Sequence, residues 1–113
     1  MKIDGSGNQQ WDQTYGGGMG DVLTSILKTT DGDFLLGGYS RSPASGNKTA
    51  PSRDAFQGSA SDYWLLKIGP SGSIQWDQSY GGNFYDNLTG VAVTSDGGYL
   101  LVGDSESAGE SGN

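Results

Sequence analysis

The sequence predicts an all-β protein made of many short strands joined by tight turns. Glycine accounts for 21 of the 113 residues, and only 33% of the residues are apolar. Aromatic residues nevertheless make up 11% of the chain, which is more than a disordered protein carries. Two Asp-Gly dipeptides, Asp31-Gly32 and Asp96-Gly97, lie between apolar runs, an arrangement that is a strong signal for β-hairpins.

An internal repeat sets the organisation of the chain. Residues 2–40 align without gaps with residues 67–105, at an offset of 65, and 21 of the 39 aligned positions are identical. We therefore interpret 1–113 as a single segment that contains repeat 1 (2–66) and a partial repeat 2 (67–113).

Each repeat predicts four strands, recognised by β-branched, aromatic and leucine-rich runs between glycine turns. The third strand is present in full only once, and the double glycines that follow the fourth strand release the chain into the next unit. The expected strands are the first (22–29 and 87–94), the second (34–36 and 99–101), the third (62–68, and the pair Lys2-Ile3) and the fourth (9–15 and 74–80).

In the last of these strands, period-2 alternation places Ile74, Trp76 and Tyr80 on one face. The earlier copy places Trp11 and Tyr15 on the equivalent face.

A four-stranded antiparallel meander that repeats head to tail is the unit of a β-propeller, so we expect blades of about 65 residues each. The inner strand of a blade must be narrow because the blades converge on an axis, and the run Gly90-Val91-Ala92-Val93 fits that place. A β-solenoid is the main alternative, although solenoids usually repeat over a shorter period.

The string DYWLLKI…SGSIQWDQSYGG…TSDGGYLLVGDS resembles a repeat of secreted and surface proteins of bacteria, often Bacteroidetes. The resemblance covers nearly the whole chain. In that family the repeats form long arrays interpreted as β-propellers, frequently upstream of a sorting signal for type nine secretion. The resemblance therefore implies an extracellular or cell-surface location and a binding or adhesive role, since the family carries no assigned catalytic residues. No recognisable sorting domain is present in this sequence.

The repeat count predicts an incomplete ring. Two whole units of 65 residues would be longer than the 113-residue chain, and most of one third strand is what is missing. Unpaired strand edges invite pairing with another chain. We therefore expect the ring to be completed by homo-oligomerisation through shared blades or strand-edge pairing, or by a longer parent chain. An open fibre is a third alternative.

Charge and composition argue against several functional classes. The formal net charge is −7 and the six basic residues form no run, which argues against nucleic-acid binding. The chain has no histidine and no cysteine, so the usual general base and thiolate chemistry are missing. No apolar run approaches the roughly 20 residues of a membrane span. We predict a protein that is not an enzyme and does not insert into a membrane.

The loop at 41–61 is the first candidate binding site, because a loop this long in a compact domain is usually functional or disordered. It carries Lys48, Arg53, Asp54 and Phe56, which would contact a ligand or a partner. The alternative interpretation is a loop that folds back over its own sheet, with Phe56 as an anchor.

A second candidate is a calcium site at Asp4, Ser6 and Asn8, whose oxygen-bearing side chains alternate as in calcium loops. The second repeat lacks the acid at this position, and an Asx turn explains the same residues. We expect no cofactor, with calcium as the one candidate.

The remaining conspicuous residues recur with the repeat, which favours structural roles over a unique active site. Recurring aspartates are expected to cap turns, and recurring aromatics to pack between sheets, with sugar stacking by tryptophan as an alternative. These residues are Trp11, Tyr15, Asp21, Asp31, Trp64, Trp76, Tyr80, Asp86 and Asp96.

Together these observations predict a non-enzymatic extracellular structural or interaction module that binds a protein or glycan partner, either self-assembling or part of a surface propeller. The alternative is a glycan- or calcium-binding, lectin-like propeller.

Overall fold

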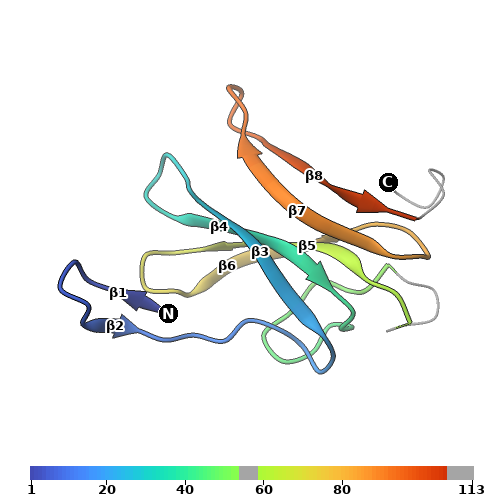
Figure 1. The fold of residues 1–113 in the computed structure, drawn as a ribbon, viewed down its shortest axis with the longest axis horizontal. Helices are drawn as coiled ribbons and strands as arrows, with labels where there is room; N and C mark the ends of the chain where they lie inside the picture. Colours follow the sequence, from blue (N-terminus) through green and yellow to red (C-terminus); the bar gives the residue numbers. More distant parts are fainter. Residues whose placement is uncertain (54–58, 107–113) are drawn as a thin grey trace.

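The computed structural model describes residues 1–53 and 59–106 (Figure 1). Every regular element in these ranges is a β-strand, and all pairings are antiparallel, so the all-β prediction is confirmed. The strands are β1 (Lys2–Ile3), β2 (Gln9–Trp11), β3 (Asp21–Lys28), β4 (Phe34–Ser40), β5 (Asp62–Ile68), β6 (Ile74–Tyr80), β7 (Asp86–Val93) and β8 (Tyr99–Ser105).

A four-stranded antiparallel sheet in the order β3-β4-β5-β6 forms the centre of the molecule (Figure 1). Each strand pairs with its neighbour in sequence. The hairpin between β3 and β4 turns at Gly32, whose φ of 89° favours glycine, and closes with a hydrogen bond from the Thr29 amide to the Asp33 carbonyl (2.9 Å). The 41–61 loop connects β4 to β5.

Two smaller sheets flank the centre, β1-β2 at the start of the chain and β7-β8 at its end. The sheets formed by the described residues are small and are not arranged as the blades of a propeller, so of the predicted fold class only the all-β, antiparallel part is confirmed. The reason is that a single chain provides one complete meander, and its end sheets have only two strands each.

One face of the central sheet is covered by β7, which lies across β3, β4 and β5 (Figure 1). Leu35 and Leu65 from the sheet and Leu88 from β7 form a cluster in which each side chain is at most 2% exposed. Burying a leucine stabilises a fold by about 1.5–3 kcal/mol, so this layer accounts for much of the attachment of the hairpin.

The opposite face is covered by the long loop and by the chain that follows β1. Trp64, Leu66 and Ile68 from β5 are buried there together with Ala50 from the loop. Partly buried residues from β2 and the segment after it pack against this cluster, so each end of the chain covers one face of the sheet.

Gly37 on β4 permits the close approach of β7. A Cβ at this position would lie 2.6 Å from Leu88 Cδ2 and 3.0 Å from Val91 Cγ1, which is closer than real Cβ contacts. Because Leu88 is fully buried, it has no free space into which it can move. The glycine is therefore required by the packing between sheets.

The expected alternation in the fourth strand is wrong at one point. Lys67 pairs with Trp76 and Ile68 pairs with Ile74, so Gln75 forms a bulge. Ile74 consequently packs on the loop-covered face and Trp76 on the face covered by β7. Tyr80, at the end of the strand, is 40% exposed.

We expect Gly37→Ala to lower the free energy of unfolding by about 1–3 kcal/mol, because the added methyl group overpacks a closed layer. Urea denaturation followed by tryptophan fluorescence measures this change. Gly5→Ala is the control, since nothing lies within 4 Å of a Cβ there. Equal stability of the two variants would contradict the packing role of Gly37.

Candidate functional site

The long loop places its lysine in the interior. Lys48 is 2% exposed, and its ammonium donates hydrogen bonds to the Ala50 carbonyl and to the Ser79 hydroxyl (3.1 Å). The ammonium also lies 5.9 Å from the centre of the Trp64 ring, which is a cation–π distance. Burial lowers the pKa of Lys48, while nearby carboxylates, Asp77 foremost, oppose that shift. In this geometry Lys48 ties the loop to the sheet and is not presented to solvent.

Asp77 on β6 is the carboxylate around which the loop is arranged. Its Oδ2 accepts hydrogen bonds from Trp64 Nε1 (2.9 Å) and from the amides of Thr49 and Ala50 (3.0 Å each). Burial opposes the ionisation of Asp77, but these hydrogen bonds outweigh it and hold its pKa below the usual value. The sequence did not single out Asp77, and its counterpart in repeat 1, Asp12, is exposed.

The other residues predicted to contact a ligand do not gather around Lys48. Arg53 is exposed, its amide donates to Asp62 Oδ2 (2.6 Å), and its Nε donates to the Ser79 carbonyl (3.4 Å). Asp54 and Phe56 lie outside the described residues. The described part of the loop folds over its own sheet.

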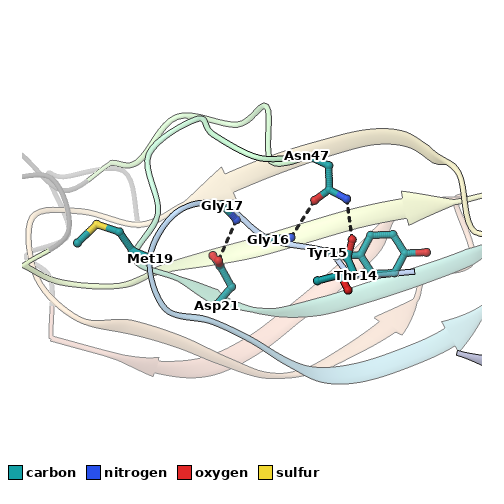
Figure 2. Close-up of a pocket in the computed structure, with 7 residues that line it drawn as sticks. All are labelled: Thr14, Tyr15, Gly16, Gly17, Met19, Asp21 and Asn47. Atoms are coloured by element: carbon teal, nitrogen blue, oxygen red, sulfur yellow. Dashed lines mark hydrogen bonds between the residues drawn. The ribbon is translucent and has the colours of Figure 1, made fainter. Parts of the chain in front are cut away.

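A small polar hollow forms where the loop meets the first double-glycine turn (Figure 2). Asn47 Nδ2 donates to the Thr14 carbonyl (2.7 Å), and Asn47 Oδ1 accepts from the Gly16 amide (2.9 Å). Asp21 Oδ2 accepts from the Gly17 amide (2.9 Å). These polar groups hold the turn together, and the hollow brings no nucleophile and base into contact.

Asp21 and Asp86 make the same interactions in the two repeats. Asp86 Oδ2 accepts from the Gly82 amide at 2.9 Å, the distance found at Asp21. The other carboxylate oxygen of each aspartate accepts a hydrogen bond from the serine at the end of the return strand, Ser40 or Ser105. Asp21 and Asp86 therefore each cap the double-glycine turn that precedes them.

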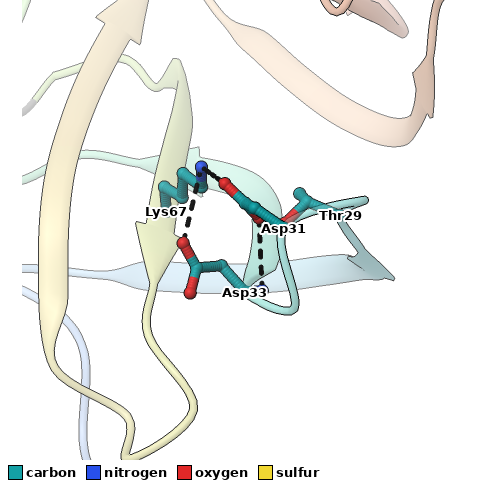
Figure 3. A network of polar contacts seen from close by, with 4 residues as sticks. All are labelled: Thr29, Asp31, Asp33 and Lys67. Carbon is teal, nitrogen blue, oxygen red and sulfur yellow. Dashed lines mark hydrogen bonds and ion pairs between the residues drawn. The ribbon is translucent and has the colours of Figure 1, made fainter.

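The first Asp-Gly turn carries an ion pair (Figure 3). Lys67 on β5 donates to Asp31 Oδ2 (2.5 Å) and lies 3.5 Å from the Asp33 carboxylate. The hydrogen bond from Lys67 holds the pKa of Asp31 well below its usual value. Within the turn, Asp31 also accepts from the Thr29 hydroxyl, and Asp96 makes the equivalent turn bonds in repeat 2.

The predicted calcium residues form a turn with internal hydrogen bonds. Asp4 Oδ1 accepts from the amides of Ser6 and Asn8 (2.9 Å each), and Oδ2 accepts from the Asn8 side chain (3.2 Å). The backbone bond from Asn8 contributes most to the lowered pKa of Asp4. This is Asx-turn geometry. Within residues 1–53 and 59–106, no three His, Cys, Asp or Glu side chains gather as a metal site would require.

Four of the recurring aromatic residues pack on the two faces of the central sheet, Trp11, Tyr15, Trp64 and Trp76, whereas Tyr80 is 40% exposed. Trp64 is fully buried, and the Trp76 ring lies 6.4 Å from that of Tyr99. Trp11 and Tyr15 donate hydrogen bonds to carbonyls of the turn between β5 and β6 (3.0 and 2.7 Å). These two bonds fasten the start of the chain to the central sheet.

Asp62 on β5 is the unusual acid of the structure. Its Oδ1 is the one buried side-chain oxygen in the described part of the chain that has no hydrogen-bond partner. Burial raises the pKa of Asp62, and the Asp86 carboxylate adds to the effect. An unsatisfied buried carboxylate oxygen costs stability. Among the described residues, no group of three His, Cys, Asp or Glu side chains forms a metal site around it.

Two apolar surfaces remain open, one on each flanking side of the central sheet. Leu23 is 37% and Ile26 is 67% exposed beside β1-β2, while Leu100 is 63% and Val102 is 61% exposed on the outer side of β8. In the sequence all four are ordinary strand residues, and the hydrophobic pattern does not predict that their side chains are exposed. We call the first surface the groove (Met1, Trp11, Leu23, Ile26, Leu36 and Ile68) and the second the hairpin face (Ala92, Leu100 and Val102).

We expect Asp77→Asn to lower the free energy of unfolding at neutral pH by about 1.5–3 kcal/mol, because it removes charged hydrogen bonds. The folded-state pKa of Asp77 is depressed, so its contribution is present above the unfolded-state pKa and is lost as pH falls through the folded-state pKa.

Urea denaturation at a series of pH values from neutral to acid measures the free energy of unfolding. The difference in this free energy between wild type and Asp77→Asn should shrink as pH falls. The control is Asp12→Asn, which changes the exposed counterpart in repeat 1. Equal effects of the two substitutions would refute the role assigned to Asp77.

In the described residues no helix is long and apolar enough to cross a membrane. No family model and no curated protein matches the sequence.

Proposed function

We propose that this chain is a non-enzymatic, self-associating structural module of the cell exterior, whose sheets act as blades of a propeller-type assembly. Association covers the groove and the hairpin face. The extracellular setting follows from the resemblance of the repeat to those of secreted and surface proteins.

The observation that carries the proposal is the opposite exposure of equivalent residues in the two repeats. Leu88 is fully buried on the central sheet, whereas its counterpart Leu23 is 37% exposed. Leu35, which lies beneath β7, is fully buried, whereas its counterpart Leu100 is 63% exposed. The same positions are thus buried where the two repeats meet and open where no neighbouring repeat is present.

The energetic argument follows from the size of these side chains. Ile26, Leu100 and Val102 are each more than 60% exposed, and covering one apolar side chain of this size is worth about 1.5–3 kcal/mol. A domain of this size has about 5–15 kcal/mol of net stability, so covering both surfaces would be a gain of comparable size. Contiguous exposed apolar patches commonly mark interaction sites.

The polar residues support the same function. The recurring aspartates that a catalytic or metal site would use serve turns, with oxygens bonded to backbone amides and hydroxyls, and Asp31 also pairs with Lys67. Beyond these turns, the described surface carries two apolar patches, the groove and the hairpin face, which suit protein association.

Native mass spectrometry and sedimentation over a range of protein concentrations test the proposal. We expect species of several chains that dissociate on dilution. Ile26→Asp and Leu100→Asp should each weaken association by about tenfold or more, since each removes a buried apolar side chain from the interface.

The matched control is Met19→Asp, which alters an exposed apolar residue outside both surfaces. A single-chain species at all concentrations would contradict the proposal, as would an equal effect of Met19→Asp.

A further inference from the structure

We infer that copies of this chain associate head to tail in one register, with β8 of a first copy pairing with β1 of a second. The β7-β8 hairpin of the first copy and the β1-β2 sheet of the second then form one four-stranded antiparallel sheet. This inference rests on the proposed function and specifies its partner, a second copy of the chain.

The strand pairing follows from the repeat. In the central sheet β4 pairs with β5, and Leu35 is the partner of Lys67. In the repeat alignment, Leu100 on β8 is the counterpart of Leu35, and Lys2 on β1 is the counterpart of Lys67. Within the chain β8 pairs only with β7, and β1 only with β2, so each has a free edge in the described structure. Free edges of this kind are templates for a further strand.

A charge pair supports the same register. In the central sheet, Lys67 bonds to Asp31 of the β3-β4 turn at 2.5 Å (Figure 3). The counterparts are Lys2 on β1 and Asp96 in the β7-β8 turn, which belong to different flanking sheets of one chain. Joining β8 to β1 brings Asp96 of the first copy to Lys2 of the second. Between two chains of net charge −7, this attractive contact favours one orientation over others.

A hydrogen bond between two sheets of the chain also has an equivalent between two copies in this register. Thr24 Oγ1 donates to the Leu88 carbonyl at 2.8 Å, which links β3 to the β7 packed on it. The equivalent donor is the exposed Thr89, and the equivalent acceptor is the Leu23 carbonyl of the second copy. The hairpin face of the first copy then covers the groove of the second.

Three positions keep the new interface from being a copy of the internal one. Val102 stands where repeat 1 has Gly37, at which a Cβ would lie 2.6 Å from Leu88 Cδ2. Opposite it, Ile26 replaces Val91. These two changes add volume, whereas Ala92 in the place of Leu27 removes it, so the side chains of two copies must pack differently from those between β7 and the central sheet.

The two surfaces differ in shape and origin, which decides the symmetry of the assembly. A groove between sheets meets the outer side of a hairpin, so the contact is heterologous. Heterologous contacts build rings when the rotation closes and fibres when it does not, and they do not build two-fold dimers.

Cysteine cross-linking tests the register directly, because the natural chain has no cysteine. Antiparallel partners have Cα atoms about 4.5–5.5 Å apart, within the range that a disulfide bridges. A mixture of the single variants Lys2→Cys and Leu100→Cys, oxidised mildly, should give a covalent heterodimer that is identified by its mass.

The control mixture contains Lys2→Cys and Ala92→Cys. Ala92 is exposed and is the partner of Leu100 on β7, so the register places it two strand spacings, about 10 Å, from Lys2. This mixture should give little heterodimer. Circular dichroism shows that each variant is folded before mixing.

A charge exchange provides a second readout that needs no cysteine. Lys2→Glu and Asp96→Lys should each weaken association about two- to five-fold, as expected for an exposed ion pair. The double variant, in which the charges are exchanged, should regain the wild-type affinity between copies.

The outcomes separate the two proposals. Multi-chain species without a selective Lys2–Leu100 cross-link and without recovery in the double variant would overturn the register but leave self-association standing. A chain that stays single at every concentration would overturn both.

Discussion

The structure depends on one constraint: its central sheet has two apolar faces, and both must be removed from water. A sheet polar on one side could leave that side in solvent, but β4 and β5 carry large apolar residues toward both sides. One face takes the β7-β8 hairpin, and the other takes the loop and the start of the chain. Exposed apolar side chains remain in the groove beside β1-β2 and on the outer side of the β7-β8 hairpin.

Polar interactions decide how closely the covering elements fit. On the loop side, Asp77 gathers backbone amides and the Trp64 indole, and Lys48 occupies the same interior. On the hairpin side, Gly37 lets β7 approach the sheet directly, and the hydroxyls of Thr24 and Ser25 donate to the carbonyls of Leu88 and Thr89. A buried carboxylate thus organises the loop-covered face, whereas close packing and hydroxyl-to-backbone hydrogen bonds join β7 to the other face.

The sequence predicted the positions of most strands. The bounds of β5 and β6 were as expected, because apolar runs between glycine turns define them. The fourth strand of repeat 1 was expected over 9–15 but ends at Trp11, since the two-residue β1 offers it no longer partner. The bulge at Gln75 could not be foreseen, because one unpaired residue reverses the alternation without altering composition.

The candidate site was harder to predict, because burial depends on neighbours that the repeat does not encode. Asp12 and Asp77 occupy equivalent positions, yet only Asp77 meets the loop and is buried. Lys48 stands in a polar loop that reads as solvent-exposed, and only the fold reveals that it points inward. These two aspartates differ in environment because Asp77 accepts hydrogen bonds from the described part of the 41–61 loop, whereas Asp12 is exposed.

The way the loop is attached has a consequence for how the sequence tolerates change. Surface loops usually accept insertions and deletions, because few contacts depend on their length. Here Lys48 and the amides of Thr49 and Ala50 bond to Ser79 and Asp77 of β6 in the interior. A change of length at 47–50 would leave buried polar groups without partners, so this part of the loop is as constrained as a strand.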